Sequence, residues 1–200
     1  MINVSIVGGS GYTGGELLRL LLFHDSCEVK QVTSERFAGK AIHKAHPNLR
    51  GAGSLKFCNL TELEPCNVLF LCLPHGQTAE RFDNFSTLAP RIIDLSADFR
   101  LSDPESYTKW YGQPHPNPGL LDRFVYGVPE INRAAIQDAT HVACAGCNAT
   151  ASTLALAPLA NRNLISSVVI DVKAGSSEAG NAATEGSHHP ERSGAVRSYR

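Results

Sequence analysis

The first residues of the chain, MINVSIVGGSGYTGGE, constrain its fold more than any other stretch. An apolar run, Val4–Val7, leads directly into a glycine cluster, and a leucine-rich helical pattern, Gly14–His24, follows it. Gly9, Gly11 and Gly14 satisfy G-x-G-x-x-G, in which glycines permit a tight turn, close approach to a pyrophosphate and close helix–strand packing. The free N–H groups and partial positive charge of the helix start favour phosphate binding. We therefore predict a dinucleotide-binding turn rather than a purely structural one, with contacts from Gly8, Ser10, Gly11, Tyr12, Thr13 and Gly14.

The end of the second predicted strand indicates which dinucleotide binds. An acidic residue about 20 positions beyond the glycines usually holds the ribose of NAD, whereas an arginine suits the 2′-phosphate of NADP. Glu35 and Arg36 supply both types, and the neighbouring Ser34 can donate to phosphate oxygens. We favour NADP and assign all three residues to its site; a solvated Glu–Arg pair is the alternative.

The alternation of apolar runs with helical patterns predicts an α/β fold with a parallel sheet. We expect an N-terminal Rossmann domain over residues 1–147, followed over 148–200 by the start of an α+β catalytic domain. The second part contains a predicted helix at Ala149–Leu159, a strand at Val168–Val172 and a small-residue loop at Lys173–Ala183. Ser187–Arg200 shows no helix or strand pattern, so we expect the chain to be truncated. The predicted strands of the first domain are Val4–Val7, Val29–Thr33, Val68–Leu73, Arg91–Leu95 and His141–Cys144.

Composition excludes several classes of function. A net charge of -1 argues against a nucleic-acid-binding protein. No apolar run approaches the roughly 18 residues that span a bilayer, and the N-terminus has no secretory signal. We therefore expect a cytoplasmic protein that does not enter membranes, with its six cysteines reduced.

The segment Cys144-Ala145-Gly146-Cys147-Asn148 is the second informative feature. With His141 it gives H-x-x-C-x-x-C, which offers zinc only three ligands, and no second C-x-x-C completes a site. A thioredoxin-like pair would follow the first strand of a small domain. Cys147 instead precedes a predicted helix, whose N-terminus favours the thiolate. We predict that Cys147 is a nucleophile and that Cys144 is packing; an inert Cys147 and a metal site remain alternatives, and no metal is assigned.

A reactive thiol beside a nicotinamide cofactor suggests reduction of an activated acyl group through a thioester. Backbone N–H groups around Asn148 could hold the developing oxyanion. Arg100 and His75 each follow a strand, where ligands of α/β proteins bind. We assign Arg100 and Asn148 to the substrate and His75 to the cofactor. The alternatives are an Asp–Arg loop brace for Arg100 and a loop histidine with satisfied hydrogen bonds for His75.

With these residues in view, the chain resembles acyl-phosphate reductases of the N-acetyl-γ-glutamyl-phosphate reductase type, which are relatives of aspartate semialdehyde dehydrogenase. The resemblance implies NADPH as cofactor, Cys147 as nucleophile, 2′-phosphate contacts from Ser34 and Arg36, and a homo-oligomer. It also implies a catalytic histidine that would come after Arg200. The segments that carry it are Gly8–Gly14, Ala45–Gly51, Leu95–Arg100, Trp110–Gly112 and Tyr126–Glu130.

Within this family the chain is most similar to the branch whose substrate is attached to an acidic amino-group carrier protein, in lysine or arginine biosynthesis. Ala145–Thr150 and Ser187–Arg192 carry that likeness. The loop that commonly reads Ser-Gly-x-Ser-Gly-Ala-Gly departs from that pattern here at Ala174 and Glu178. We expect reduction of carrier-linked aminoadipate 6-phosphate or glutamate 5-phosphate to the semialdehyde. The alternatives are an N-acetyl-γ-glutamyl-phosphate reductase and a non-catalytic NADP-binding module. Arg192, Arg197 and Arg200 are candidate contacts to the acidic carrier.

Overall fold

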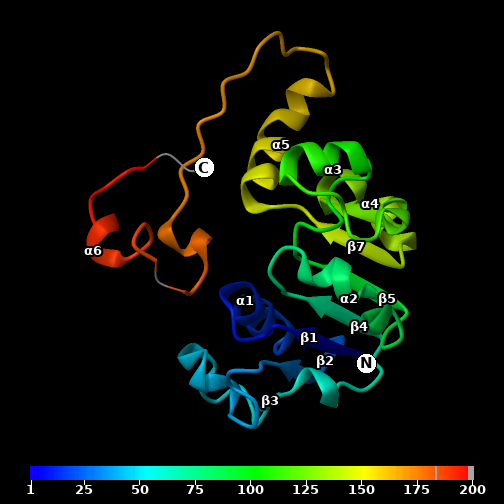
Figure 1. Cartoon of the computed structure of the whole chain (residues 1–200), viewed down its shortest axis with the longest axis vertical. Coiled ribbons are helices and arrows are strands. Elements are labelled where there is room, and N and C mark those ends of the chain that lie inside the picture. The colour runs from blue at the N-terminus through cyan, green and yellow to red at the C-terminus, as the bar shows by residue number, and fades with distance from the viewer. Residues whose placement is uncertain (183, 198–200) are drawn as a thin grey trace.

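A parallel β-sheet of seven strands forms the body of the protein (Figure 1). The computed structural model describes residues 1–182 and 184–197. The strand order is β3-β2-β1-β4-β5-β7-β6, and all neighbouring strands run parallel. The strands are β1 (Ile2–Val7), β2 (Cys27–Thr33), β3 (Phe57–Cys58), β4 (Val68–Leu71), β5 (Arg91–Asp94), β6 (Phe124–Gly127) and β7 (His141–Cys144). The α-helices are α1 (Tyr12–Leu21), α2 (Gln77–Ser86), α3 (Pro104–Tyr111), α4 (Pro129–Asp138), α5 (Cys147–Ala160) and α6 (His189–Arg192).

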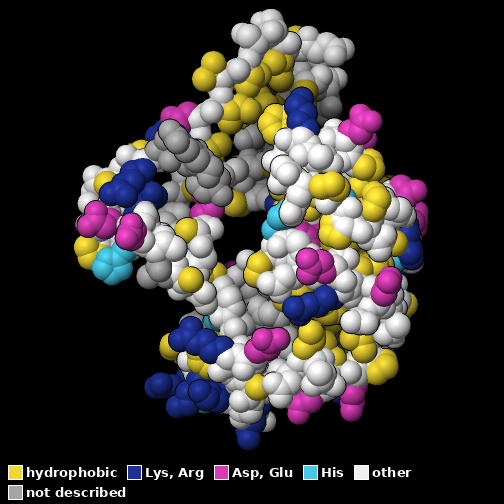
Figure 2. All heavy atoms as spheres, in the orientation of Figure 1, with side chains coloured by type: hydrophobic (Ala, Val, Ile, Leu, Met, Phe, Trp, Pro, Cys, Tyr) yellow, Lys and Arg dark blue, Asp and Glu magenta, His cyan; other side chains and the backbone are white. Residues whose placement is uncertain are grey.

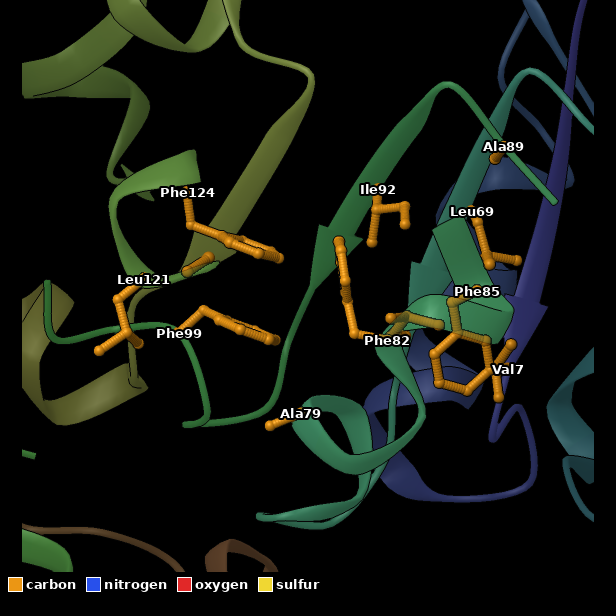
Figure 3. Packing of buried hydrophobic residues seen from close by; sticks show 12 residues of the cluster. Val7, Leu69, Ala79, Phe82, Phe85, Ala89, Ile92, Phe99, Leu121 and Phe124 are labelled. Carbon is orange, nitrogen blue, oxygen red and sulfur yellow. The ribbon is translucent and has the colours of Figure 1, made fainter. Parts of the chain in front are cut away.

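Alternation of side chains along the central strand divides the apolar core between the two faces of the sheet. Val4 and Ile6 of β1 belong to the cluster that contains Leu18 of α1. Val7 of the same strand belongs to the cluster built on Phe82 and Phe85 of α2 (Figure 3). Because successive side chains of a strand point to opposite faces, α1 and α2 cover opposite faces of the sheet.

Three phenylalanines attach the loop after β5 to strand β6 and helix α2. Phe99 from that loop stacks on Phe124 of β6 with ring centroids 3.9 Å apart, and Phe82 meets each ring edge-on at 5.5 Å (Figure 3). All three side chains are buried. Offset-stacked and edge-to-face pairs are the favoured aromatic arrangements, so this loop is held firmly where it passes the ends of the strands.

The strand order confirms the predicted Rossmann-type fold. From β1 the chain passes to β2 and β3 on one side, and then crosses to β4 and β5 on the other. The reversal beside β1 creates the crevice at the carboxyl ends of the strands in which α/β proteins bind ligands. The loops after β1, β2, β4, β5 and β7 therefore all open toward one edge of the sheet.

Two of the helices that follow a glycine begin earlier than the sequence predicted. α1 begins at Tyr12 rather than Gly14, with Gly11 as its N-cap. α5 begins at Cys147 rather than Ala149, with Gly146 as its N-cap. Glycine fits the extended cap backbone and lets the following residues enter the first turn. Cys147 is therefore the first residue of its helix.

The segment after α5 leaves the sheet and returns toward α1 (Figure 1). The strand predicted at Val168–Val172 is wrong: this stretch is extended but unpaired, and Val169 is 98% exposed. A strand needs a partner for its backbone groups, and none of the described strands lies beside it. The short helix α6 was not anticipated, and Ala183 of the predicted loop lies outside the described residues. No helix within 1–182 or 184–197 is long and apolar enough to cross a membrane.

Candidate active site

The glycine turn after β1 has room for a ligand on one side only. A Cβ on Gly8, whose φ is +78°, would lie 2.4 Å from the carbonyl oxygen of Cys72. A Cβ on Gly14 would lie 2.6 Å from the Cα of Gly9 and 2.7 Å from the oxygen of Gly8. A Cβ on Gly11 would meet only that oxygen, at 3.9 Å, so the space before α1 is open. The turn therefore fits a dinucleotide pyrophosphate, which requires bare backbone and free helix N–H groups.

Neighbouring segments hold the glycine turn in place. The N–H of Gly9 donates to the carbonyl of Thr33 at 2.9 Å, and the N–H of Gly8 donates to its Oγ1 at 3.1 Å. On the other side, Nε2 of buried His46 lies 2.7 Å from the carbonyl oxygen of Gly9. A Cβ on Gly15 would lie 2.4 Å from the His46 ring. His46 was not predicted as a brace; the additional glycine at position 15 was the available signal.

The end of β2 lies beside this turn, as predicted for a ribose-phosphate site. The buried Ser34 hydroxyl donates to Ser10 Oγ at 2.8 Å, so it joins the two loops. Arg36 is exposed, and its guanidinium carbon lies 5.3 Å from the centroid of the Phe37 ring. Lys40 lies over the same ring at 5.6 Å and brings a second cation that the sequence analysis did not select. Glu35 is also exposed.

The loops after β4 and β5 meet through a buried carboxylate, Asp98. This side chain accepts hydrogen bonds from the N–H groups of Gly76 at 2.6 Å and Ala79 at 2.8 Å. It also lies 2.8 Å from Nδ1 of His75. Nε2 of His75 is 3.3 Å from the Tyr107 hydroxyl. His75 thus occupies the predicted edge of the sheet with both ring nitrogens engaged by protein groups, and its role toward the cofactor stays a prediction.

A second buried carboxylate, Asp94, ends β5. Its Oδ1 accepts from Thr78 Oγ1 at 3.0 Å and from the N–H of Ser96 at 3.1 Å, and Oδ2 accepts from Ser96 Oγ at 2.6 Å. Burial raises the pKa of Asp94 to about 6, because desolvation of the charged form outweighs these hydrogen bonds.

This pKa predicts how stability depends on pH. A carboxylate whose pKa is about 3.9 when unfolded and about 6 when folded favours the folded state below about pH 4, and that contribution is lost as the pH rises through about 6. The free energy of unfolding of Asp94→Asn, measured relative to wild type, should therefore rise by about 3 kcal/mol as the pH increases from about 4 to 7. Urea unfolding of both proteins at each pH measures this difference, with exposed Asp83→Asn as the control. An unchanged difference would contradict the prediction.

Arg100 reaches across the carboxyl ends of β5 and β7. Its Nε donates to the carbonyl of Cys144 at 2.8 Å and its Nη2 to the carbonyl of Leu95 at 3.0 Å. A Cβ on Gly146 would lie 3.1 Å from its Nη1. The hydrogen-bond partners of the Arg100 guanidinium are therefore backbone carbonyls. The aspartate partner expected for an Asp–Arg loop brace is not among them. Arg100 also lines the cavity that contains Cys147, where the predicted substrate contact would be made.

Cys147 lies exposed in that cavity of about 590 Å³, at the start of α5. Thr13 from the first turn of α1 lines the same cavity, so the glycine turn and the thiol share one space. Figure 2 shows the hollow between the returning segment and the α/β body. Cys147 therefore does not belong to the buried core, and its role as nucleophile stays a prediction. Burial instead raises the pKa of Cys72 to about 12 and of Cys144 to about 11, which agrees with a packing role for Cys144.

The zinc alternative finds no support in the geometry. His141 packs against the rings of Phe82 and Phe124 in the core, with Nδ1 2.9 Å from Thr140 Oγ1. Across the part of the chain that the structure describes, no three His, Cys, Asp or Glu side chains come close enough to bind a metal ion.

The side chain of Asn148 is held by a residue from the returning segment. Its Nδ2 donates to Oε1 of Glu178 at 2.7 Å, and the same oxygen lies 3.7 Å from Cys147 Sγ. Asn148 thus lies at the predicted site, with one of its two Nδ2 hydrogens taken by Glu178. From the sequence, Glu178 stood out only as a departure from a common loop pattern.

The parallel fold, the open glycine turn and the thiol at the same sheet edge define a dinucleotide-binding α/β protein. Residues 3–139 match the family described as "Semialdehyde dehydrogenase, NAD binding domain", and residues 147–200 match "Semialdehyde dehydrogenase, dimerisation domain". The chain belongs to the semialdehyde dehydrogenase family, and its first part is an NAD-binding domain.

Relatives with known names support this membership. The chain is 51% identical over 200 residues to the LysW-L-2-aminoadipate 6-phosphate reductase of Deinococcus radiodurans, covering 99% of this chain and 58% of the relative. It is 47% identical over 203 residues to the LysW-L-2-aminoadipate/LysW-L-glutamate phosphate reductase of Saccharolobus solfataricus, with coverage of 99% and 58%. Aspartate semialdehyde dehydrogenase II of Vibrio cholerae, complexed with ASA, shares the fold with a TM-score of 0.57 and 19% identity, over 80% of this chain and 47% of that chain. The chain thus spans less than two thirds of the length of these relatives.

Proposed function

We propose that this chain supplies the cofactor domain and the nucleophile of an NADPH-dependent reductase. Its reaction converts an acyl phosphate to a semialdehyde and releases phosphate. The observation that carries the proposal is the shared cavity, in which exposed Cys147 and Thr13 of the glycine turn line one space. The names of the relatives support a substrate that is aminoadipate or glutamate phosphate linked to a carrier protein.

The residues of the cavity suit attack on an acyl phosphate. The start of α5 favours the thiolate of Cys147, which forms a bond to the acyl carbon while phosphate departs. Free N–H groups in the first turn of α5 and the remaining donors of Arg100 face the developing negative charge. NADPH, when bound, supplies the hydride that reduces the resulting thioester. Release of the aldehyde returns Cys147 to the thiolate.

The preference for NADP over NAD rests on the end of β2. Exposed Arg36 and Lys40 both lie over the Phe37 ring, close in sequence to Ser34. Two cations suit a 2′-phosphate because guanidinium and ammonium groups bind its oxygens strongly. We assign the contacts to Ser34 and Arg36 as the sequence suggests, and add Lys40.

Carrier and oligomer contacts belong to the second part of the chain. The match of residues 147–200 to a dimerisation domain supports a homo-oligomer. Of the proposed carrier contacts, Arg192 ends α6, and Arg197 donates to the carbonyl of Glu191 at 3.2 Å and lies 3.5 Å from its carboxylate. Arg200 lies outside the described residues. Arg192 is therefore the stronger candidate for an acidic partner.

The test offers the full-length protein two substrates and two cofactors. We expect phosphate-dependent reduction of NADP when the carrier-linked semialdehyde is supplied, with at least about tenfold lower kcat/KM for the free N-acetylated semialdehyde and for NAD in place of NADP. The same comparison with Cys147→Ser measures the background. Equal or better use of the N-acetylated substrate would favour the acetylglutamate alternative, and binding of NADP without turnover would favour a non-catalytic module.

A further inference from the structure

The buried imidazole of His46 packs against the glycine turn, in space that glycine at position 15 leaves open. A Cβ on Gly15 would lie 2.4 Å from the ring, and Nε2 of the ring lies 2.7 Å from the carbonyl oxygen of Gly9. The backbone of His46 is held as well, because its N–H donates to the carbonyl of Ile42 at 3.0 Å. His46 belongs to Ala45–Gly51, a segment of the family resemblance that the proposed function leaves without a role.

The hydrogen bond at Nε2 has only one possible direction. A carbonyl oxygen can only accept, so Nε2 of His46 carries the hydrogen and donates it to Gly9. The N–H of Gly9 is engaged too, since it donates to the carbonyl of Thr33 at 2.9 Å. A Cβ on Gly9 would lie 2.0 Å from Cγ2 of Val32, so the residue is also packed tightly on β2. Both polar backbone groups of Gly9 are therefore fixed.

The direction of the Gly9 carbonyl also sets the direction of the next N–H group. No peptide bond among the described residues is cis, and the C=O and N–H of a planar trans peptide point in opposite directions. With the Gly9 oxygen directed at buried His46, the N–H of Ser10 points away from it. Across residues 1–182 and 184–197, no protein group accepts a hydrogen bond from this N–H. It is therefore available to an anion at the turn.

Resting on the proposed function, we propose that His46 is a positioning residue for the pyrophosphate of NADPH. Its hydrogen bond to Gly9 holds the Gly9–Ser10 peptide so that the N–H of Ser10 donates to a phosphate oxygen, beside the free N–H groups at the start of α1. Without this donor the buried Gly9 oxygen loses its partner, and the peptide rotates to recover one. The N–H of Ser10 then turns away from the phosphate. This loss affects the pyrophosphate and not the 2′-phosphate, whose proposed contacts lie at the end of β2.

Two ligands that differ in the pyrophosphate test this role. NADPH uses both parts of the proposed site, whereas 2′-AMP carries the 2′-phosphate without a pyrophosphate. Isothermal titration calorimetry of the full-length protein measures the affinity for each ligand. In His46→Leu we expect NADPH to bind about tenfold more weakly and 2′-AMP to bind as in wild type. In His46→Gln the amide nitrogen can replace Nε2 as donor, so NADPH affinity should return to within about threefold of wild type.

Three further variants complete the comparison. Gly15→Ala displaces the imidazole without removing it and should reproduce the selective loss of NADPH affinity, which keeps the test available if His46→Leu does not fold. Lys40→Gln should weaken both ligands, because the proposed 2′-phosphate contact is common to them. His43→Leu changes a half-buried histidine of the neighbouring turn η1 (Ile42–Lys44) and should weaken neither.

Selective loss of NADPH affinity with recovery in His46→Gln is the result that a merely structural role would not give. Unchanged NADPH affinity in His46→Leu or Gly15→Ala would overturn the proposal. Equal weakening of NADPH and 2′-AMP in these variants, or no recovery in His46→Gln, would overturn it as well. A wild-type protein that binds NADPH but reduces no acyl phosphate would instead count against the proposed function, because the positioning role is measured by binding alone.

Discussion

Replacing Cys147 by serine is expected to lower turnover by at least about 1,000-fold while dinucleotide binding is unchanged. A serine hydroxyl keeps the shape of the side chain, but it is a far weaker nucleophile than a thiolate at neutral pH. Cys147 lies at the first position of α5 and does not contribute to the buried core. Steady-state rates of the full-length protein and a fluorescence titration with NADPH give the two measurements.

Cys144 offers the matched control for that substitution. It lies three residues earlier, at the end of β7, and burial raises its pKa to about 11. Cys144→Ser should therefore retain most of the activity. Substantial turnover by Cys147→Ser, or an equal loss in both variants, would contradict the assignment of the nucleophile.

Adding one methyl group at Gly14 is expected to destabilise the protein by about 3 kcal/mol and to abolish dinucleotide binding. The new Cβ would lie 2.6 Å from the Cα of Gly9 and 2.7 Å from the oxygen of Gly8, both backbone atoms of the same turn. Backbone cannot move aside as a flexible side chain can, so either the turn or the start of α1 must shift. Urea unfolding and NADPH titration of Gly14→Ala measure the two effects.

Gly11→Ala separates folding from binding in the same turn. Its Cβ would meet only the Gly8 oxygen, at 3.9 Å, and its φ of -78° is accessible to alanine. The free energy of unfolding should change by less than about 1 kcal/mol. NADPH affinity should nevertheless fall at least about tenfold, because the methyl group would project into the open space before α1. Normal NADPH affinity in both variants would show that the dinucleotide does not bind at this turn.

Local patterns in the sequence predicted five of the seven strands of the sheet and its parallel arrangement. Apolar runs such as Val4–Val7 and Val68–Leu73 correspond to central strands, and the helix after each glycine motif forms, although it begins two residues early. Such elements follow from hydrophobic periodicity and from the backbone freedom of glycine, which depend on neighbouring residues. The strands β3 and β6 were not predicted, because their pairing with β2 and β7 joins segments that are distant in sequence.

Val168–Val172 has the residues of a strand but forms none in the structure. Four of its five residues are apolar and β-branched, which is the composition of a strand, but pairing requires another strand beside them. The stretch lies unpaired, and α5 before it has no buried residue. Hydrophobic side chains gather at this end of the molecule in Figure 2.

Residues close together in the chain are sufficient to predict the parallel α/β fold, the glycine turn and a cysteine at the start of a helix. The tertiary structure alone decided what surrounds them. Asp98 joins the loops after β4 and β5, His46 braces the glycine turn, and Glu178 meets Cys147 from 31 residues away. Contacts of this kind depend on where packing brings distant segments together, and no local pattern of residues encodes that position.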